Sequence, residues 1–360
     1  MDESKEIGNR VMNNQITQMM GIAYPLIQAP MAGVQGSDLA IAVSEAGGLG
    51  SLPCAMLSVA ELHAELTHIR SRTSRPINVN FFCHTPPNPD VERAAAWRQT
   101  LAPFYAELGL SEQEQVSAGG QRTPYSQAQA EVLAQFKPEV VSFHFGLPDE
   151  QAISEIKAWG SSVIASATTV AEALWLQARG VDAIIAQGLE AGGHRGHFLS
   201  ADLTLQQGTF SLLPQVIAAV KVPVIAAGGI VDVASIQAAI AMGAHGVQVG
   251  TAYLLCDECN TSVIHRAAIQ SDAAKHTALT NVFSGRPARG IVNRVMQALG
   301  PINDTVPEFP LAASSIAPLR AAAERIGSAD FSPLWCGQNA SGCRTVSAAE
   351  LTHMLVAAFD

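Results

Sequence analysis

The stretch QGLEAGGHRG, residues 187–196, places glutamine, glutamate, histidine and arginine among four glycines, directly after the apolar run VDAIIA. Glycine tolerates backbone conformations and close approaches that a side chain forbids. Four glycines in ten residues therefore predict a loop that lies tightly against something else in the folded molecule. Its polar side chains are candidates for contacting whatever the loop encloses.

Two further glycine sites follow apolar runs. The run VPVIAAGG ends in Gly228 and Gly229, and HGVQVG ends in Gly250, directly before Thr251. Glycine amides beside a helix N-terminus bind a phosphate through backbone N–H groups and the helix dipole, and a threonine hydroxyl adds a donor. A phosphorylated ligand is therefore predicted. The alternative is that each glycine only makes a strand-to-helix turn.

Eight short runs rich in valine, isoleucine and alanine recur along the chain, each followed by a break and a helical pattern. They span residues 24–30, 47–52, 76–82, 139–145, 161–166, 181–187, 222–228 and 245–250. Near-continuous apolar strands that alternate with helices are typical of a parallel sheet covered on its faces. The stretches 167–180 and 232–244 carry apolar residues at helical spacing, as crossover helices do. Eight such units predict an α/β fold, a closed (β/α)8 TIM barrel.

The spacing of the strands predicts two departures from a plain barrel. About sixty residues separate the third and fourth strands, which is too long for a simple connection, so a helical insertion is predicted at about 85–135. A mostly helical segment follows the eighth strand. We therefore predict a barrel over residues 1–280 and a helical C-terminal extension over 281–360 that packs at the barrel mouth.

The active site of such a barrel lies at the carboxyl ends of the strands. The residues there are polar with few charges: Gln28, Asn78, Asn80, His84, His144, Ser166 and Gln187. None of the five lysines ends a predicted strand, which argues against a Schiff-base aldolase, and no Asp/Glu pair is there to hold a divalent metal. Amides that both donate and accept suit a neutral heteroaromatic ring such as a flavin. Together with the phosphate site, they predict FMN as the cofactor.

The composition indicates a globular protein that handles a small molecule. The 360-residue chain is 48% hydrophobic and carries a formal net charge of −10 without a Lys/Arg run, which disfavours nucleic acid and anionic membranes as partners. Because MDESKEIGNR precedes no long apolar stretch, neither a signal peptide nor a spanning helix is expected, and a cytoplasmic location is. Cys256 and Cys259 form a CxxC pair that Cys336 and Cys343 could complete as a zinc site, although buried thiols are the preferred interpretation.

The strand-end motifs together resemble the nitronate monooxygenases, formerly called 2-nitropropane dioxygenases. The motifs are QAPMAGV, NVNFFCH, SFHFGLP, AQGLEAGGHRG, PVIAAGGI, GVQVGTAYLL and FSGRPARGIVNR, and they cover nearly the whole chain. NFFCH and GGHRG look most like the class I enzymes. The resemblance implies an FMN-dependent barrel that oxidises alkyl nitronates with O2 to a carbonyl compound and nitrite, without a nicotinamide. A role in detoxification is left open.

Carried over to this chain, the resemblance makes His194 the catalytic residue. The FMN contacts that it implies are Ala29, Pro30, Met31, Asn80, Gln187, Gly192, Gly193, Gly228, Gly229, Gln248, Val249, Gly250 and Thr251, with Asn78 as an alternative to Asn80. His144 and Ser166 are expected in the substrate pocket. Several family members carry tyrosines near PEFPLAASSIAPLR and this chain has none there, so the substrate side of the pocket is not specified.

Several alternatives stay open. His194 and His197 could only brace their loop, because histidine is often structural. The same FMN barrel could serve an enoyl-ACP reductase or an NAD(P)H:quinone reductase, which take hydride from a nicotinamide, or a flavin-binding protein without turnover. The sequence does not specify which nitronate is used, whether neutral nitroalkanes are also used, what Cys256 and Cys259 do, or whether the protein is a homodimer.

Overall fold

The structure, a computed structural model, describes residues 14–111 and 122–360. The stretch MDESKEIGNR and the residues SAGGQ of the polar segment SAGGQRTPYSQ lie outside the described residues. Eight parallel strands form one sheet: β1 (Leu26–Gln28), β2 (Gly50–Pro53), β3 (Ile77–Phe82), β4 (Val140–His144), β5 (Ser162–Ala167), β6 (Ala183–Gln187), β8 (Val224–Ala227) and β9 (Gly246–Val249). Each lies within one of the eight predicted runs or extends it by one residue.

The sheet closes on itself. Its strands neighbour one another in the order β1-β9-β8-β6-β5-β4-β3-β2. The two ends meet where the Gln28 N–H donates to the Leu49 carbonyl at 2.9 Å and the Leu49 N–H donates to the Leu26 carbonyl at 2.8 Å. The predicted (β/α)8 barrel is therefore confirmed.

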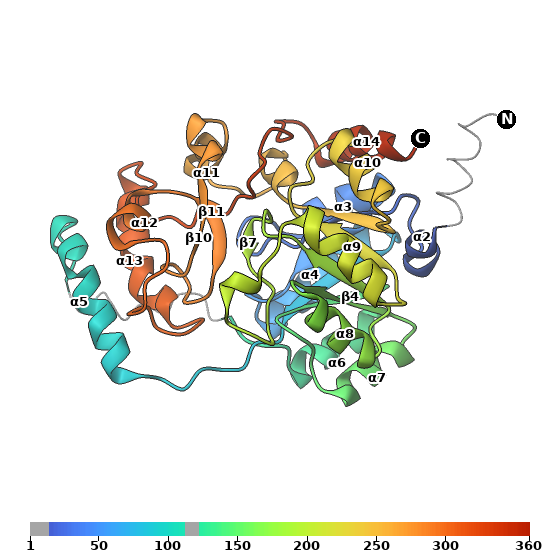
Figure 1. The fold of residues 1–360 in the computed structure, drawn as a ribbon, viewed down its shortest axis with the longest axis horizontal. Coiled ribbons are helices and arrows are strands. Elements are labelled where there is room, and N and C mark those ends of the chain that lie inside the picture. The colour runs from blue at the N-terminus through green and yellow to red at the C-terminus, as the bar shows by residue number, and fades with distance from the viewer. Residues whose placement is uncertain (1–13, 112–121) are drawn as a thin grey trace.

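Helices cover the outside of the barrel (Figure 1). In chain order they are α3 (Ser37–Glu45), α4 (Val59–Arg72), α6 (Gln127–Phe136), α7 (Glu150–Ala158), α8 (Val170–Ala178), α9 (Thr209–Ala219), α10 (Val233–Ala241) and α14 (Ala348–Val356). The last of these, α14, packs against both α10 and α3 and so completes the ring. The predicted C-terminal extension therefore does not pack wholly at the barrel mouth, because Leu351 and Leu355 of α14 are buried in the core between sheet and helices.

Two excursions of the chain build a second lobe beside the barrel (Figure 1). One contributes α5 (Val91–Glu107); the other contributes α11 (Val263–Ile269), β10 (Thr277–Thr280), β11 (Ala288–Ile291), α12 (Arg294–Leu299) and α13 (Ala312–Arg325). Trp97 of α5, Val295 of α12 and Ile316 of α13 share a separate apolar core, and Tyr105 Oη donates to the Ser315 carbonyl at 2.6 Å. The insertion predicted at about 85–135 thus divides: α5 joins this lobe, whereas α6 packs on α4 and α7 of the barrel. The boundary at residue 280 stays a prediction.

The remaining elements are short. The 3-10 helices span Leu203–Leu205, Thr251–Leu255, Asp272–Lys275 and Ala357–Phe359, and the two-residue strand β7 (Gly193–His194) pairs with β11 in a second, antiparallel sheet. Within the described ranges, no helix has both the length and the apolar character needed to cross a membrane.

The inside of the barrel changes from apolar to polar along the strands. Every second residue points inward. Toward the amino ends, Ile27, Val140, Ile164 and Ile225 form an apolar core that also includes residues of α2 (Gln15–Met20). Toward the carboxyl ends, the side chains on the inward positions are polar and line a cavity: Asn80, Ser142, Ser166, Gln187 and Gln248. The alternation turns these side chains inward, and their places late in the strands put them at one end of the barrel.

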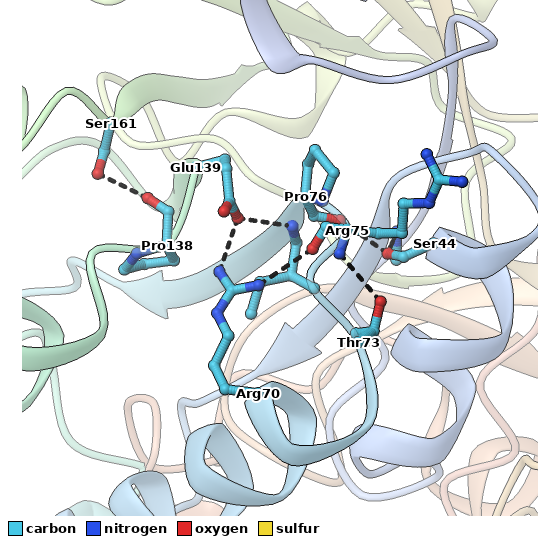
Figure 2. Close-up of polar contacts among 10 residues, drawn as sticks. Ser44, Arg70, Thr73, Arg75, Pro76, Pro138, Glu139 and Ser161 are labelled. Atoms are coloured by element: carbon cyan, nitrogen blue, oxygen red, sulfur yellow. Dashed lines mark hydrogen bonds and ion pairs between the residues drawn. The ribbon is translucent and has the colours of Figure 1, made fainter.

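Polar contacts tie together the amino ends of β3 and β4 (Figure 2). Glu139 Oε2 accepts from Arg70 Nη2 at 2.7 Å and from the Ile77 N–H at 3.0 Å. The Ser44 hydroxyl donates to the Pro76 carbonyl at 2.8 Å. These bonds satisfy backbone groups where the strands begin. They hold the strand register at the end of the barrel opposite the cavity.

Candidate functional site

A cavity of about 1310 Å³, part of it open to solvent, lies at the carboxyl ends of the strands. Of the residues predicted from the sequence, those that line it are Ala29, Pro30, Met31, Asn80, His144, Ser166, Gln187, Gly192, Gly193, His194, Gly228, Gly229, Gln248, Gly250 and Thr251. The fold thus brings side chains and glycines from seven of the eight barrel strands or their following loops to one place.

Val249 is the predicted contact that does not line the cavity. Its side chain is buried in the core between sheet and helices, because it alternates with the inward-facing Gln248 on β9. The two alternatives Asn78 and Asn80 lie at different depths in the barrel. Asn78 lies deeper in the barrel, where its Nδ2 donates to Ser51 Oγ at 2.9 Å, and Asn80 lines the cavity.

A buried arginine holds the glycine-rich loop, residues 187–196. Arg195 Nη1 donates to the Gly188 carbonyl at 2.6 Å, and Nη2 donates to the Gln187 carbonyl at 2.8 Å. Its guanidinium also bonds Gln206 Oε1 at 2.9 Å. The Arg195 side chain is fully buried, and among the described residues it is the donor to the Gln187 carbonyl, whereas the Gly188 carbonyl also accepts from the Ala191 N–H at 3.1 Å. The arginine in the motif is therefore a brace for the loop.

The glycine-rich loop packs against a segment from far along the chain. An added Cβ at Gly192 would lie 2.6 Å from the Gly337 nitrogen, which leaves no room for a side chain. The Gly337 N–H in turn donates to Thr251 Oγ1 at 2.9 Å. The glycines that the sequence singled out thus permit a close contact with residues 336–337 as well as with the cavity.

Gln187 is largely committed to its own loop. Its Oε1 accepts from the Gly196 N–H at 2.8 Å, and its Nε2 donates to the His194 carbonyl at 3.0 Å. An amide has two N–H donors, so one remains for a ligand. Gln187 therefore positions the backbone of His194 while its side chain lines the cavity.

His194 lies on β7, and its ring is flanked by aromatic side chains. The ring centroids of Phe309 and Trp335 lie 5.4 and 5.5 Å away. His194 Nε2 is 2.9 Å from Ser284 Oγ, and the Ser284 hydroxyl donates to the Arg286 carbonyl at 3.3 Å. Because a serine has one proton to donate, we infer that Nε2 carries the imidazole hydrogen and that Nδ1 presents a lone pair. In the described part of the chain, Nδ1 has no hydrogen-bonding partner.

Burial keeps the imidazoles of this site neutral. The pKa of His194 lies well below its usual value because of desolvation, reinforced by the charges of Arg122 and Arg286. Burial likewise lowers the pKa of His144 to about 3, and His144 Nε2 donates to the His194 carbonyl at 3.1 Å. Burial and Arg286 lower the pKa of His84 to about 4. His194 is therefore unprotonated at neutral pH and able to accept a proton.

The glycines after β8 leave backbone groups beside the cavity. Gly228 and Gly229 have φ angles of +115° and +73°, which favour glycine. Gln248 Oε1 is buried without a partner among the described residues, as expected for a group that awaits a donor from a ligand. The oxygens of nearby Glu190 accept from the Thr209 N–H and hydroxyl at 2.8 and 2.9 Å. Uncharged amides around a pocket fit a phosphate and a neutral ring.

The CxxC cysteines do not line the cavity. Burial raises the pKa of Cys256 to about 12, and Cys259 Sγ donates to the Val34 carbonyl at 3.1 Å. Across residues 14–111 and 122–360, no three His, Cys, Asp or Glu side chains gather as a metal site. Both cysteines are buried, protonated thiols.

Sequence reasoning missed part of the cavity wall: Phe82, Arg122, Trp335, Gly337 and Asn339. The two-residue alternation of β3 could have found Phe82, because it shares the inward face with Asn80. Arg122 and Trp335 lie in segments without a strand pattern. No local signal places those two residues at the mouth of the barrel.

The sequence model of the nitronate monooxygenase family matches residues 13–358. The chain belongs to the nitronate monooxygenase family. A nitronate monooxygenase of Pseudomonas aeruginosa is 39% identical over 346 residues, covering 96% of this chain and 99% of the relative. A nitronate monooxygenase of Paraburkholderia phytofirmans is 40% identical over 339 residues, covering 94% of this chain and 92% of the relative.

Solved structures agree with this family assignment. A nitroalkane oxidase from Streptomyces ansochromogenes has a TM-score of 0.86 at 38% identity, covering 96% of this chain and 97% of the other. FabK from Thermotoga maritima has a TM-score of 0.71 at 25% identity, covering 96% of each chain. Sequence and structure thus support a nitronate monooxygenase over the reductase alternatives. Nitronate monooxygenases are flavin-dependent oxidoreductases, and this chain is an enzyme of that kind.

Proposed function

We propose that this enzyme uses FMN to oxidise an alkyl nitronate with O2 to a carbonyl compound and nitrite. The observation that carries the proposal is the neutral, half-buried His194, whose Nδ1 has no partner in the described part of the chain and whose cavity also contains the glycines after β8 and β9. A base beside a phosphate-binding backbone in one cavity suits an FMN enzyme that takes a proton from its substrate. A cytoplasmic location and a homodimer stay predictions.

FMN would be held by backbone groups at one end and by amides at the other. The N–H groups around Gly228, Gly229 and Gly250 and the Thr251 hydroxyl would bind its phosphate. Ala29, Pro30, Met31, Asn80, Gln187, Gly192, Gly193 and Gln248 would contact the rest of the cofactor. The unpartnered Gln248 Oε1 supports this fit. Bound FMN would supply the redox chemistry, as acceptor of the electrons of the substrate and as their donor to O2.

His194 would act as the catalytic base. Its Nδ1 would accept the α-proton of a neutral nitroalkane, whereas a nitronate has already lost that proton. Ser284 and His144 hold the imidazole and its backbone in place. Phe82 and Trp335 in the cavity wall would exclude water from the reacting atoms, and Ser166 would lie on the substrate side.

The test combines cofactor analysis with turnover. The purified protein should show a flavin spectrum, release FMN on heating, and form nitrite from propane-2-nitronate in air. Finding FAD, or no flavin after reconstitution, would overturn the phosphate assignment. Anaerobic bleaching of the flavin by NADPH or NADH without nitrite formation would instead indicate a reductase, and flavin without any turnover a binding protein.

A further inference from the structure

Among the described residues, the cavity wall contains one cation. Arg122 lines the cavity, and its Cζ lies 6.0 Å from the ring centroid of Phe309. The Phe309 ring is also the neighbour of His194, at a centroid separation of 5.4 Å. Among the described residues, the Arg122 guanidinium has no hydrogen bond and no ion pair. The Phe309 ring therefore neighbours both the proposed base and a guanidinium with five N–H donors.

Neither of the other charged groups nearby presents a free charge to the cavity. Arg286 packs over Phe145 at 4.0 Å, donates to the His197 carbonyl and does not line the cavity. Glu190 lines the cavity, but its oxygens accept from Thr209. Along the described wall, Arg122 is thus the one cation, and it lacks a carboxylate. An unpaired charge in a mostly buried position is costly unless a ligand of opposite charge completes it.

We propose that Arg122 binds the nitronate group of the substrate and sets the preference of the enzyme for the anion over the neutral nitroalkane. This inference rests on the function proposed above. A nitronate is planar and shares one negative charge between two oxygens, which matches the flat fork of a guanidinium through two parallel hydrogen bonds. A neutral nitro group offers the same two oxygens without the charge. Arg122 is therefore a specificity-determining residue, and His194 serves the substrate that still carries its proton.

The test replaces Arg122 with glutamine in the FMN-loaded enzyme and compares two substrates. The KM for propane-2-nitronate should rise about 10- to 100-fold, as expected for the loss of hydrogen bonds between charged groups. The KM for 2-nitropropane should stay within about twofold, and kcat on the nitronate should change little. Arg122→Lys keeps the charge but loses the fork, so its KM should fall between those of the wild type and Arg122→Gln.

Arg320 supplies the matched control. It is an arginine of α13 that acts on Arg122 through its charge, and its side chain is 45% exposed and paired with Glu324. Arg320→Gln removes one positive charge from the same region without touching the cavity wall. The KM for the nitronate should then stay within about twofold of the wild type, because an exposed charge is screened by solvent.

Nitrate provides a measurement that does not depend on turnover. It is a planar, inert oxyanion, and calorimetric titration of the FMN-loaded enzyme should show about 10-fold weaker nitrate binding in Arg122→Gln than in wild type. An unchanged nitrate affinity together with an unchanged nitronate KM would overturn the inference. So would equal rises in KM for both substrates, which would make Arg122 a packing partner of Phe309. If no nitronate is oxidised by the wild type, the proposed function fails, and nitrate binding alone still decides whether Arg122 is an anion site.

Discussion

Replacing His194 with asparagine should separate proton transfer from substrate binding. A neutral nitroalkane must lose its α-proton before it can be oxidised, whereas a nitronate has none to lose. Asparagine keeps a polar side chain on β7 but cannot accept a proton. Two substrates assayed on one variant therefore act as an internal control.

The expected magnitudes follow from the hydrogen bonds of the imidazole. Loss of a general base lowers turnover of the nitroalkane by about 10²-fold or more, which is a barrier increase of about 3 kcal/mol. For the nitronate, His194 has no donor to offer, because Nε2–H is bound to Ser284 and Nδ1 carries a lone pair. The kcat/KM for the nitronate should therefore stay within about threefold of the wild type.

The assay is nitrite release from 2-nitropropane and from propane-2-nitronate, with FMN content and circular dichroism as checks on folding. Loss of the ring contacts to Phe309 and Trp335 removes about 1 kcal/mol of packing each, which the fold should tolerate. Equal loss on both substrates with FMN retained would refute the role of a base and make His194 a binding group. Unchanged turnover of both would move the base to His144 or remove it.

Three further predictions concern pH, the cofactor and the loop. Because the pKa of His194 is lowered, the imidazole stays unprotonated as the pH falls. The kcat/KM for 2-nitropropane should therefore stay level from pH 8 down to about 6. A decline of kcat/KM with a midpoint at pH 6.5 or above would contradict this. Gly229→Leu should give a folded protein that lacks FMN, since a bulky side chain blocks the phosphate. Gly229→Ala carries the same backbone strain at φ +73°, but its Cβ would meet Glu190 atoms at no less than 3.6 Å, so it should keep the cofactor and controls for the strain. Normal FMN content in the leucine variant would place the phosphate elsewhere. Arg195→Met should lower the free energy of unfolding by about 2 kcal/mol, measured by urea titration, because the Gln187 carbonyl loses its donor and the Gly188 carbonyl keeps only the Ala191 N–H. A change below about 1 kcal/mol would mean that the loop does not depend on the arginine.

The strands and the inward-facing residues could be predicted from the sequence because their signals are local. A buried parallel strand is a short apolar run, and its two-residue alternation fixes which side chains face the barrel interior, as with Asn80 and Gln248. The glycines after β8 and β9 follow from the same strands. Val249 shows that a motif match does not place a side chain in the cavity. It lies within the motif GVQVGTAYLL, but its side chain faces the helices because that of Gln248, its neighbour on β9, faces the cavity.

The positions of two helices could not be predicted, because they are set by contacts between segments that lie far apart in the sequence. The eighth helix of the ring, α14, begins at Ala348, far from β9, which ends at Val249. Its apolar face resembles that of any amphipathic helix, so its sequence does not distinguish packing on α3 and α10 from packing at the barrel mouth. The same holds for α5, which leaves the third crossover to share a core with α13.

By itself, the sequence determined the barrel, the polar carboxyl end of its strands and the glycine-rich loop. Each of these depends on residues that are neighbours along the chain. Only the tertiary structure decided what surrounds His194: the hydroxyl of Ser284, the rings of Phe309 and Trp335, and the guanidinium of Arg122. These groups come from segments that share no local pattern with the loop. Their joint burial, which no single segment encodes, lowers the pKa of the imidazole and leaves it neutral beside a cation.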